Sequence, residues 1–587
     1  MTFRSMISIS FFTLCLQAWA ADADSAANSD SSAISKELNE VVVQAGIGLR
    51  AQSAISNTEI IGQTQLVRAA CCNLGESFST NPSVDVSYSD AATGARQIKL
   101  LGLSGTYVQM LTENVPNLRG AAIPYSLGFV PGPWMQSIQV SKGAASVKNG
   151  YESITGQINI EYLKPQAPDG VRGNAYFDSK LRQEVNADAG VHLSDRLSTS
   201  LLVHFENRQS EHDANSDGFM DMPRLRQFNA MHRWAYLSPG FISQLSARVL
   251  VDNRESGMSA HSHADASIPL YEISVDTKRY EMQWKNALMR NDERNTSLAL
   301  ILHGSIHDAD NRFGNTLYDV RQTNGYAQLL WESNLSEAHN LAVGVNLNHD
   351  YYKERFGGSA FSLNDTDGAL PTHESETTIG GYAQYTFKPN EKWTLMPGIR
   401  FDHSSRYGNF VTPRLHVKYS PTQAFTLRAS AGKGFRSPHG IAENSQMLAC
   451  GRTFIIAENL KQEEAWNYGV ATNFHLPIAD KVLDINAEYY YTHFINQMVM
   501  NIDGIAGPNT VSFSNLHGKS YSHTLQIDAT YPVFEGFTAT GAFRYTDART
   551  TYDTGMLRYR PLTSRYKALL TLSYATPMII WQFDLTG

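Results

Sequence analysis

Residues 379–388 of the chain read IGGYAQYTFK, and their side chains alternate between two chemical kinds. In an extended chain Ile379, Ala383 and Phe387 lie on one face, and polar side chains such as Gln384 lie on the other. A strand that separates an apolar environment from a polar one must alternate in this way. The stretch therefore predicts a β-strand with one apolar and one polar face.

The same alternation continues from about residue 170 to the end of the chain, for example at residues 425–431 and 566–574. Many such segments of about 10 residues, with aromatic residues near their ends, are typical of a transmembrane β-barrel with a polar interior. We count about 18 or 19 of them. The sequence thus predicts a mainly β protein whose largest part is an antiparallel barrel in a membrane.

The connections between these segments give an independent signal, because short and long ones alternate. Outer-membrane barrels have short periplasmic turns and longer outside loops, whereas a periplasmic all-β protein has no reason to alternate. Short connections occur at residues 193–195, 237–240, 290–293, 388–392, 420–423 and 532–536, and long ones near 208–225, 254–275, 308–323, 353–375, 435–462, 498–516 and 547–562.

The last residues, 581–587, lie partway into a strand with no closing aromatic residue. A single-chain bacterial barrel closes with an even number of antiparallel strands. We therefore expect the sequence to be C-terminally incomplete, with about three or four strands missing. The alternative is a smaller natural barrel that closes on a ragged edge strand, which is a costly exposure of backbone groups.

The N-terminus predicts export. Arg4 supplies a positive charge, residues 6–16 are mostly apolar, and residues 18–20 (AWA) form a cleavage site, so residues 1–20 form a signal peptide. Its apolar run of about 11 residues is too short for a membrane-spanning helix, and no other segment approaches the required length of about 18. An exported chain with many amphipathic strands predicts location in the bacterial outer membrane.

Residues 21–37 are small and polar and predict a flexible tether. A short apolar run, LNEVVVQA, follows at residues 38–45. The hydrophobic pattern of the next hundred or so residues predicts a compact α+β domain. It has a helix at residues 63–78 and strands at residues 97–101, 107–112, 138–140 and 156–162.

Composition excludes two other classes of protein. The net charge is −8, and nucleic-acid binding would favour a basic surface, so no nucleic-acid partner is expected. After removal of the signal peptide three cysteines remain, Cys71, Cys72 and Cys450. An odd number of cysteines argues against a disulfide framework.

The α+β domain and the barrel together resemble the TonB-dependent receptors of bacterial outer membranes, over nearly the whole mature chain. No single segment is diagnostic, but their order and spacing are. The segments are residues 38–45 (LNEVVVQA), 71–86 (CCNLGESFSTNPSVDV), 97–103 (QIKLLGL), 141–160 (SKGAASVKNGYESITGQINI), 410–419 (FVTPRLHVKY), 432–438 (GKGFRSP) and 459–468 (NLKQEEAWNY). Leu101 stands where the family usually has arginine, so the role of that arginine is not carried over.

The resemblance implies a plug domain at residues 46–165 inside a barrel at residues 166–587, with about 22 strands when complete. It also implies that residues 38–45 are the TonB box, through which TonB and its inner-membrane energising complex drive transport. An exposed strand can add to the sheet edge of a partner. The coupling residues are then Leu38, Glu40, Val41, Val42 and Val43. The alternative is that this run is only an edge strand of the plug.

The expected cargo is a metal chelate: a ferric siderophore, haem, cobalamin or copper. Thiol, thioether and imidazole groups suit copper or haem iron better than a hard ferric ion. The candidate ligand-binding residues are Cys71, Cys72, Met110, His261, His263, His439, Met447 and Cys450. A residue of any of these types more often belongs to the ordinary core or surface of a protein than to a ligand site. The adjacent cysteines could instead form a disulfide.

The second long loop contains DANSDGFMD at residues 213–221. Oxygen ligands at alternate positions, followed by a glycine for the turn, resemble the opening of a calcium loop. Asp213, Asn215, Asp217 and Asp221 are therefore candidate ligands of a structural calcium ion, in half a motif, since Arg224 stands where the final glutamate should be. The alternative is a solvated acidic loop, and no other resident cofactor is expected.

Two other functions can be weighed from the sequence. A passive porin or adhesive barrel would leave the first 165 residues without a purpose. An enzyme is not expected, because the sequence has no nucleophile elbow, HExxH zinc motif or phosphate loop. The resemblance therefore favours a transporter that also contacts outer-membrane lipids.

Overall fold

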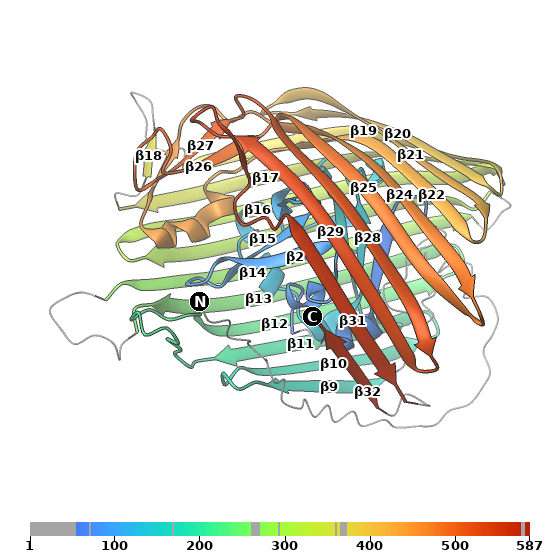
Figure 1. Ribbon diagram of the computed structural model, residues 1–587, viewed down its shortest axis with the longest axis horizontal. Coiled ribbons are helices and arrows are strands. Elements are labelled where there is room, and N and C mark those ends of the chain that lie inside the picture. The colour runs from blue at the N-terminus through green and yellow to red at the C-terminus, as the bar shows by residue number, and fades with distance from the viewer. Residues whose placement is uncertain are drawn as a thin grey trace.

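The computed structural model describes residues 54–69, 72–166, 169–259, 270–290, 294–358, 361–363, 372–576 and 581–587. They form an N-terminal plug inside a large antiparallel barrel (Figure 1). The TonB-box candidates Leu38, Glu40, Val41, Val42 and Val43 lie outside these residues, as do Cys71, His261 and His263.

The plug contains a five-stranded sheet in the order β1-β7-β8-β5-β6 and a three-stranded sheet in the order β2-β3-β4. Its apolar core includes the fully buried Phe129, Trp134 and Ile158. The strands are β1 (Thr58–Gly62), β2 (Val84–Asp90), β3 (Ala95–Leu100), β4 (Leu103–Ser104), β5 (Val108–Thr112), β6 (Val115–Pro116), β7 (Met135–Lys142) and β8 (Gly156–Tyr162). The four strand predictions for this domain are therefore confirmed.

The helix predicted at residues 63–78 is wrong in extent. Helix α1 spans only Gln63–Arg68, and a 3-10 turn, η1, spans Glu76–Phe78. Between them Asn73 forms a bridge with Pro131, and the Cys72 carbonyl accepts a hydrogen bond from Gly132 N–H at 2.8 Å. Backbone groups that a longer helix would use internally are thus paired with a distant segment. Tertiary pairing therefore overrides the local helical pattern.

The barrel strands form a closed order, in which β9 lies between β32 and β10. Among the described residues the order holds nineteen strands plus the three-residue β30, which agrees with the predicted count. The full number of about 22 and the missing strands stay predictions. The bounds are β9 (Gly170–Phe177), β10 (Gln183–Ser194), β11 (Leu197–Arg208), β12 (Arg224–Ser238), β13 (Phe241–Gly257), β14 (Glu272–Arg290), β15 (Thr296–Phe313), β16 (Thr316–Ser336), β17 (His339–Gly357), β19 (His373–Asn390), β20 (Trp393–Ser404), β21 (Gly408–Thr422), β22 (Phe425–Arg436), β24 (Glu463–Ile478), β25 (Lys481–Asn496), β28 (Ser520–Phe534), β29 (Phe537–Thr551), β30 (Leu557–Tyr559), β31 (Tyr566–Ala575) and β32 (Gln582–Thr586).

The decisive stretch at residues 379–388 lies in β19 and behaves as predicted. Ile379 is 55% exposed on the outer face, whereas Gln384 and Thr386 are buried on the inner face. Gln384 Oε1 accepts a hydrogen bond from Ser146 of the plug at 2.8 Å. The polar faces of the strands therefore line an interior that the plug fills.

Among the described residues, short and long connections alternate as predicted with two exceptions, one of which is the three-residue connection at residues 405–407 between β20 and β21. The expected loop at residues 308–323 is instead paired strand, because β15 and β16 continue to a two-residue turn at residues 314–315. Gly314 has a φ of +59°, a conformation that glycine adopts without strain. We call the end of the barrel that carries the long connections the long-loop end, and the other the short-turn end.

The long connections carry structure of their own. A 3-10 segment, η7, spans Ala442–Cys450. Beside it lies a four-stranded sheet in the order β18-β23-β27-β26, made from Phe361–Leu363, Thr453–Ile456, Thr510–Asn515 and Met498–Ile502. Phe454 and Phe513 bury fully in its core. This sheet and η7 lie at the long-loop end (Figure 1).

Candidate functional site

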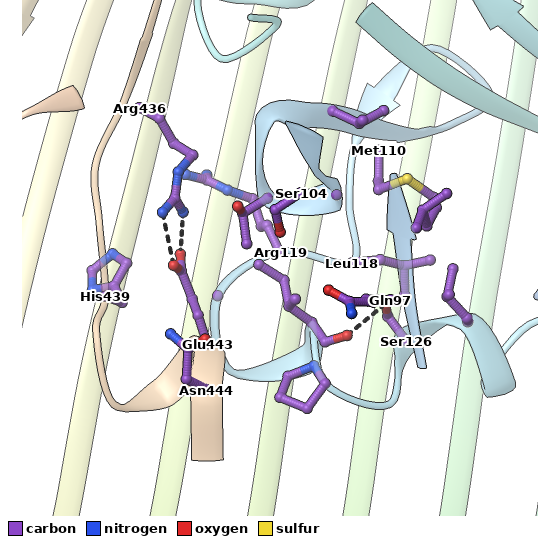
Figure 2. Close-up of a pocket in the computed structure, with 18 of the residues that line it drawn as sticks. Gln97, Ser104, Met110, Leu118, Arg119, Ser126, Arg436, His439, Glu443 and Asn444 are labelled. Atoms are coloured by element: carbon purple, nitrogen blue, oxygen red, sulfur yellow. Dashed lines mark hydrogen bonds and ion pairs between the residues drawn. The ribbon is translucent and has the colours of Figure 1, made fainter. Parts of the chain in front are cut away.

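A cavity of about 110 Å³ lies between the plug and η7. Figure 2 shows that plug residues and residues of the loop after β22 face each other across it. Tyr352, near the end of β17, and Arg436, the last residue of β22, place it in the long-loop half of the barrel. Long loops lie outside the cell in this type of barrel, so the cavity is on the side where a ligand would arrive.

Arg436 organises one side of the cavity. Its Nη1 and Nη2 atoms bind the two carboxylate oxygens of Glu443, on η7, at 2.5 and 2.9 Å (Figure 2). Its Nε atom binds Glu463, at the start of β24, at 2.6 Å. Burial raises the pKa of Glu443, and the neighbouring guanidinium opposes this. Tyr107 of the plug donates to Glu463 Oε1 at 2.8 Å, so this cluster joins η7, the barrel and the plug.

Arg119 organises the floor of the cavity from the plug. Its Nη2 atom lies 2.5 Å from Glu152 Oε1, and its Nη1 atom lies 3.0 Å from Asp350 Oδ2 in β17. The next residue, Gly120, has a φ of +61°, and a Cβ there would stand 2.1 Å from the Tyr352 hydroxyl. The plug backbone therefore approaches the barrel wall as closely as a glycine permits.

His439 adds an imidazole to the same cavity. Its ring packs on the Tyr352 ring with centroids 4.2 Å apart, and its Nδ1 atom lies 3.4 Å from Glu374 Oε1. Burial lowers the pKa of His439 to about 3, so the ring is neutral at physiological pH. A neutral imidazole can act as a metal ligand or a hydrogen-bonding group.

Two further lining residues offer uncharged donor atoms. Met110, in β5, contributes a thioether, and Figure 2 places it on the opposite side of the view from His439. Gln446, on η7, is 6% exposed, and its Oε1 atom has no hydrogen-bond partner among the described residues. The cavity thus combines guanidinium groups that carboxylates already neutralise with uncharged nitrogen, oxygen and sulfur atoms.

Comparison with known families accounts for both parts of the chain. Residues 50–157 match the TonB-dependent Receptor Plug Domain, and residues 263–586, more than half of the chain, match the TonB dependent receptor-like, beta-barrel family. The chain belongs to the TonB-dependent receptors. These are β-barrel proteins of the bacterial outer membrane, as the sequence predicts.

Individual relatives are distant. The iron-regulated outer membrane virulence protein of Vibrio cholerae is 23% identical, over 68% of this chain and 60% of the relative. The vitamin B12 transporter BtuB of the same species is 18% identical, over 66% of this chain and 61% of the relative. The chain therefore spans about 60% of the length of these relatives. The structure of the FrpB iron transporter from Neisseria meningitidis has a TM-score of 0.68 and 16% identity, over 88% of this chain and 84% of FrpB.

Within this receptor, two of the predicted ligand-binding residues reach the cavity, Met110 and His439. Met447 and Cys450 lie on η7 but do not line it, and the exposed Cys450 thiol donates to the Met447 carbonyl at 2.7 Å. Cys72 is buried elsewhere in the plug, and burial raises the pKa of its thiol. The structure therefore does not gather these described thiol, thioether and imidazole groups into one set.

The predicted calcium residues of the receptor lie in the loop between β11 and β12. Asp213 accepts hydrogen bonds from the Asp217 and Gly218 N–H groups at 3.1 and 2.9 Å, and Asp221 accepts one from Ala214 N–H at 2.9 Å. Gly218 supplies the turn, with a φ of +88°. In the described part of the chain, no three His, Cys, Asp or Glu side chains are grouped as for a metal ion. Calcium binding by Asp213, Asn215, Asp217 and Asp221 stays a prediction.

Sequence reasoning missed the residues that shape the cavity most, namely Arg119, Glu152, Tyr352 and Gln446. Their types are common, and nothing near them in the sequence marks them. The pair Arg119-Gly120 is the one usable signal, because a glycine beside a charged residue can mark a close backbone approach.

No helix in the described residues is long and apolar enough to cross a bilayer.

Proposed function

We propose that this protein is an energy-coupled transporter, which binds a metal chelate at the long-loop end and releases it into the periplasm. The observation that carries this proposal is the cavity of about 110 Å³ between the plug and η7, which we call the outer cavity. A plug that fills the barrel closes it on its inner side. A ligand in this cavity can advance only if the plug moves. Binding and passage are therefore separate steps, and the second requires work.

The contacts of the plug with the barrel wall indicate why work is needed. Lys142 pairs with Glu488, Arg233 pairs with Glu113 at 2.5 Å, and Arg544 pairs with Asp85. The first two pairs are buried on both sides, and leaving one member of such a pair buried without its counter-charge costs about 3–5 kcal/mol. Thermal motion alone therefore rarely displaces the plug. This argues against a passive porin.

TonB is the proposed source of this work, through residues 38–45. Among the described residues the first plug strand, β1, is an edge strand of the five-stranded sheet and pairs with β7 alone. A pull on the chain before β1 therefore acts on a sheet edge, where pairs can separate one after another. A partner that adds a strand to residues 38–45 could exert such a pull.

The cargo is proposed to be a metal chelate. Two relatives are named for iron regulation and vitamin B12 transport, and the FrpB structure is named as an iron transporter. The cavity provides the imidazole of His439 and the thioether of Met110, which suit copper or haem iron. Its volume of about 110 Å³ is below the roughly 150 Å³ of a cavity that binds benzene. A ligand as large as haem or cobalamin therefore requires η7 to move outward.

Deletion of residues 38–45 tests the proposal. Cells that make the deleted receptor are given labelled ferric siderophore, haemin, cyanocobalamin or copper(II), and surface binding and uptake are measured separately. Deletion of residues 28–35 from the tether, an equal length, is the matched control. We expect the first deletion to abolish uptake of the probe that the intact receptor transports, with binding retained, and the second to change neither. Equal uptake by the two deletion variants would contradict the coupling.

A further inference from the structure

A second, smaller cavity of about 20 Å³ lies between the plug and the barrel wall formed by β12 to β15. Arg233 and Gln283, which line it, lie in the halves of β12 and β14 nearer the short-turn end. Asn117 of the plug lines both this inner cavity and the outer one. The two cavities are therefore neighbours in depth, with a plug segment between them.

The segment between them comprises residues 113–120 and contains β6, an edge strand of two residues. Glu113 and Asn114, with φ values of +51° and +64°, form the two-residue turn that joins β5 to β6, a hairpin turn that requires positive φ at both central positions. Leu118 lies outside this turn and has a φ of +54°, a left-handed conformation that a leucine rarely adopts. The backbone at Leu118 is therefore held in place by its surroundings.

Side chains, rather than strand pairing, hold this segment to the barrel. Arg279 Nη2 donates to Asn117 Oδ1 at 2.7 Å, and Arg233 Nη2 lies 2.5 Å from Glu113 Oε1. Lys285 Nζ lies 3.6 Å from Glu113 Oε2. Burial would raise the pKa of Glu113, but Arg233, Lys164 and Lys285 outweigh it and hold that pKa well below its usual range. Such contacts can be exchanged without breaking the main sheet of the plug.

We propose that residues 113–120 are the gate between the two cavities, and that the transported ligand passes along β14 and β15 when they move. The proposal rests on the transport function above and adds the place where the path opens. The inner cavity is then a transit position. It is lined by charged and polar groups that include Arg248, Glu281 and His303. Both His303 ring nitrogens lack a hydrogen-bond partner among the described residues, so this wall offers unused polar atoms.

The position of the gate in the plug sheet connects it with the pulled strand. In the order β1-β7-β8-β5-β6 the gate strand β6 and the first strand β1 are the two opposite edges. β5 pairs in parallel with the fully buried β8, and β8 pairs with β7, which carries β1. β5 in turn pairs with β6, so a pull on β1 reaches the gate strand through four strand pairings.

Reversible crosslinking of the gate to the wall tests the proposal in the full-length receptor. Asn117→Cys and Arg279→Cys are combined in a background with Cys71→Ser, Cys72→Ser and Cys450→Ser. The thiols are joined with a short bis-maleimide that contains a reducible disulfide. The control pair is Ser83→Cys with Gln526→Cys, because Gln526 Nε2 donates to Ser83 Oγ at 3.2 Å and neither residue lines the outer or the inner cavity. The probe is the one of the four above that the uncrosslinked variant takes up.

We expect the gate crosslink to reduce uptake at least tenfold with surface binding unchanged, and reduction of the linker to restore uptake. The control crosslink should leave uptake within twofold of the uncrosslinked variant. Normal uptake through a crosslinked gate would overturn the proposal, and so would equal blocks by the two crosslinks, because the plug would then move as a whole. Loss of binding would also overturn it, since the segment would then shape the outer site. Failure of the parent receptor to take up any of the four probes would instead count against the transport function.

Discussion

Lys142 of the plug and Glu488 of β25 form an ion pair in which each side chain is only 2% exposed. Asn57 donates to the second oxygen of Glu488 at 2.7 Å, so both carboxylate oxygens are occupied by the plug. The link joins β7, inside the plug sheet, to the barrel wall. Any movement of the plug that includes β7 must separate these charges.

Lys142→Met should loosen the plug, because Glu488 is then left buried without its cation. The expected loss is about 3–5 kcal/mol, measured from urea titrations in which proteolysis of the plug reports its release. Lys392→Met, at an exposed lysine in a short turn, is the control and should change stability by less than about 0.5 kcal/mol. Equal effects of the two substitutions would contradict the assigned role of the pair.

Gly156→Ala should unfold the plug and spare the barrel. Gly156 has a φ of +153°, and an added Cβ would stand 2.2 Å from the Ser141 carbonyl oxygen in the neighbouring strand. Because that atom is backbone, the clash cannot be relieved by a side-chain rotation. Proteolysis should then remove the plug, while the barrel keeps the heat-modifiable electrophoretic mobility of a folded barrel. Gly325→Ala, which meets nothing within 4 Å, should behave like the parent. A protease-resistant plug in the Gly156→Ala variant would show this reading to be mistaken.

Glu76→Gln should reduce stability in a pH-dependent way. Burial alone would raise the pKa of Glu76, but Arg182 and Arg96 outweigh it and lower that pKa to about 2. Because the pKa of an unfolded glutamate is about 4.3, the ionised group stabilises the fold above that pH and ceases to do so as the pH falls towards 2. The difference between parent and variant should be about 1.5–3 kcal/mol at pH 7. It should shrink steadily below pH 4, as followed by thermal unfolding; a constant difference down to pH 3 would refute the assignment.

His439→Phe should distinguish a role of His439 as a metal ligand from a role in packing at the outer cavity. The phenyl ring keeps the contact with Tyr352 but removes both nitrogens. If His439 is a ligand, binding of copper(II) or haemin should fall at least tenfold while cyanocobalamin binding is kept. In the parent, the lowered pKa of His439 predicts an affinity that does not change between pH 5 and 8 on account of this ring. A change centred near pH 6.5, or unaltered copper and haemin binding by the variant, would remove His439 from the ligand set.

If the loop at residues 213–221 binds calcium, then adding calcium to chelator-treated parent receptor should raise the midpoint temperature of its thermal unfolding. Asp213→Asn combined with Asp217→Asn removes two charges but keeps an oxygen at each position, so the backbone hydrogen bonds can persist. This variant should not respond to calcium. A similar response of parent and variant would assign the effect to another site, and no response of the parent would leave an acidic loop without calcium.

The barrel could be predicted from sequence because its signal is local. Alternation such as Ile379 against Gln384 depends only on strand geometry, and it recurs in many of the barrel strands, for example in β11, β12 and β19. Other local signals were misleading. Residues 63–78 have a helical pattern, but pairing of Asn73 with Pro131 ends the helix early. The paired residues lie 58 positions apart, so no local pattern could predict this.

The candidate site was predictable only in part, for the same reason. Met110 and His439 could be proposed from their chemistry alone. The contact of Arg119 with Asp350 depends on how the plug is threaded through the barrel, as does that of Gly120 with Tyr352. Each joins segments more than 200 residues apart, which composition and periodicity do not reveal. Residues 38–45, identified by resemblance, lie outside the described residues and depend on experiment.

The most direct test of TonB-driven transport is uptake by cells that express this receptor with and without a functional TonB. Labelled ferric siderophore, haemin, cyanocobalamin and copper(II) are each offered, and surface-bound and internal label are separated by washing. Energy-coupled transport predicts that one probe binds to both kinds of cell and accumulates only in cells with TonB. Equal accumulation of that probe in cells lacking TonB would contradict it.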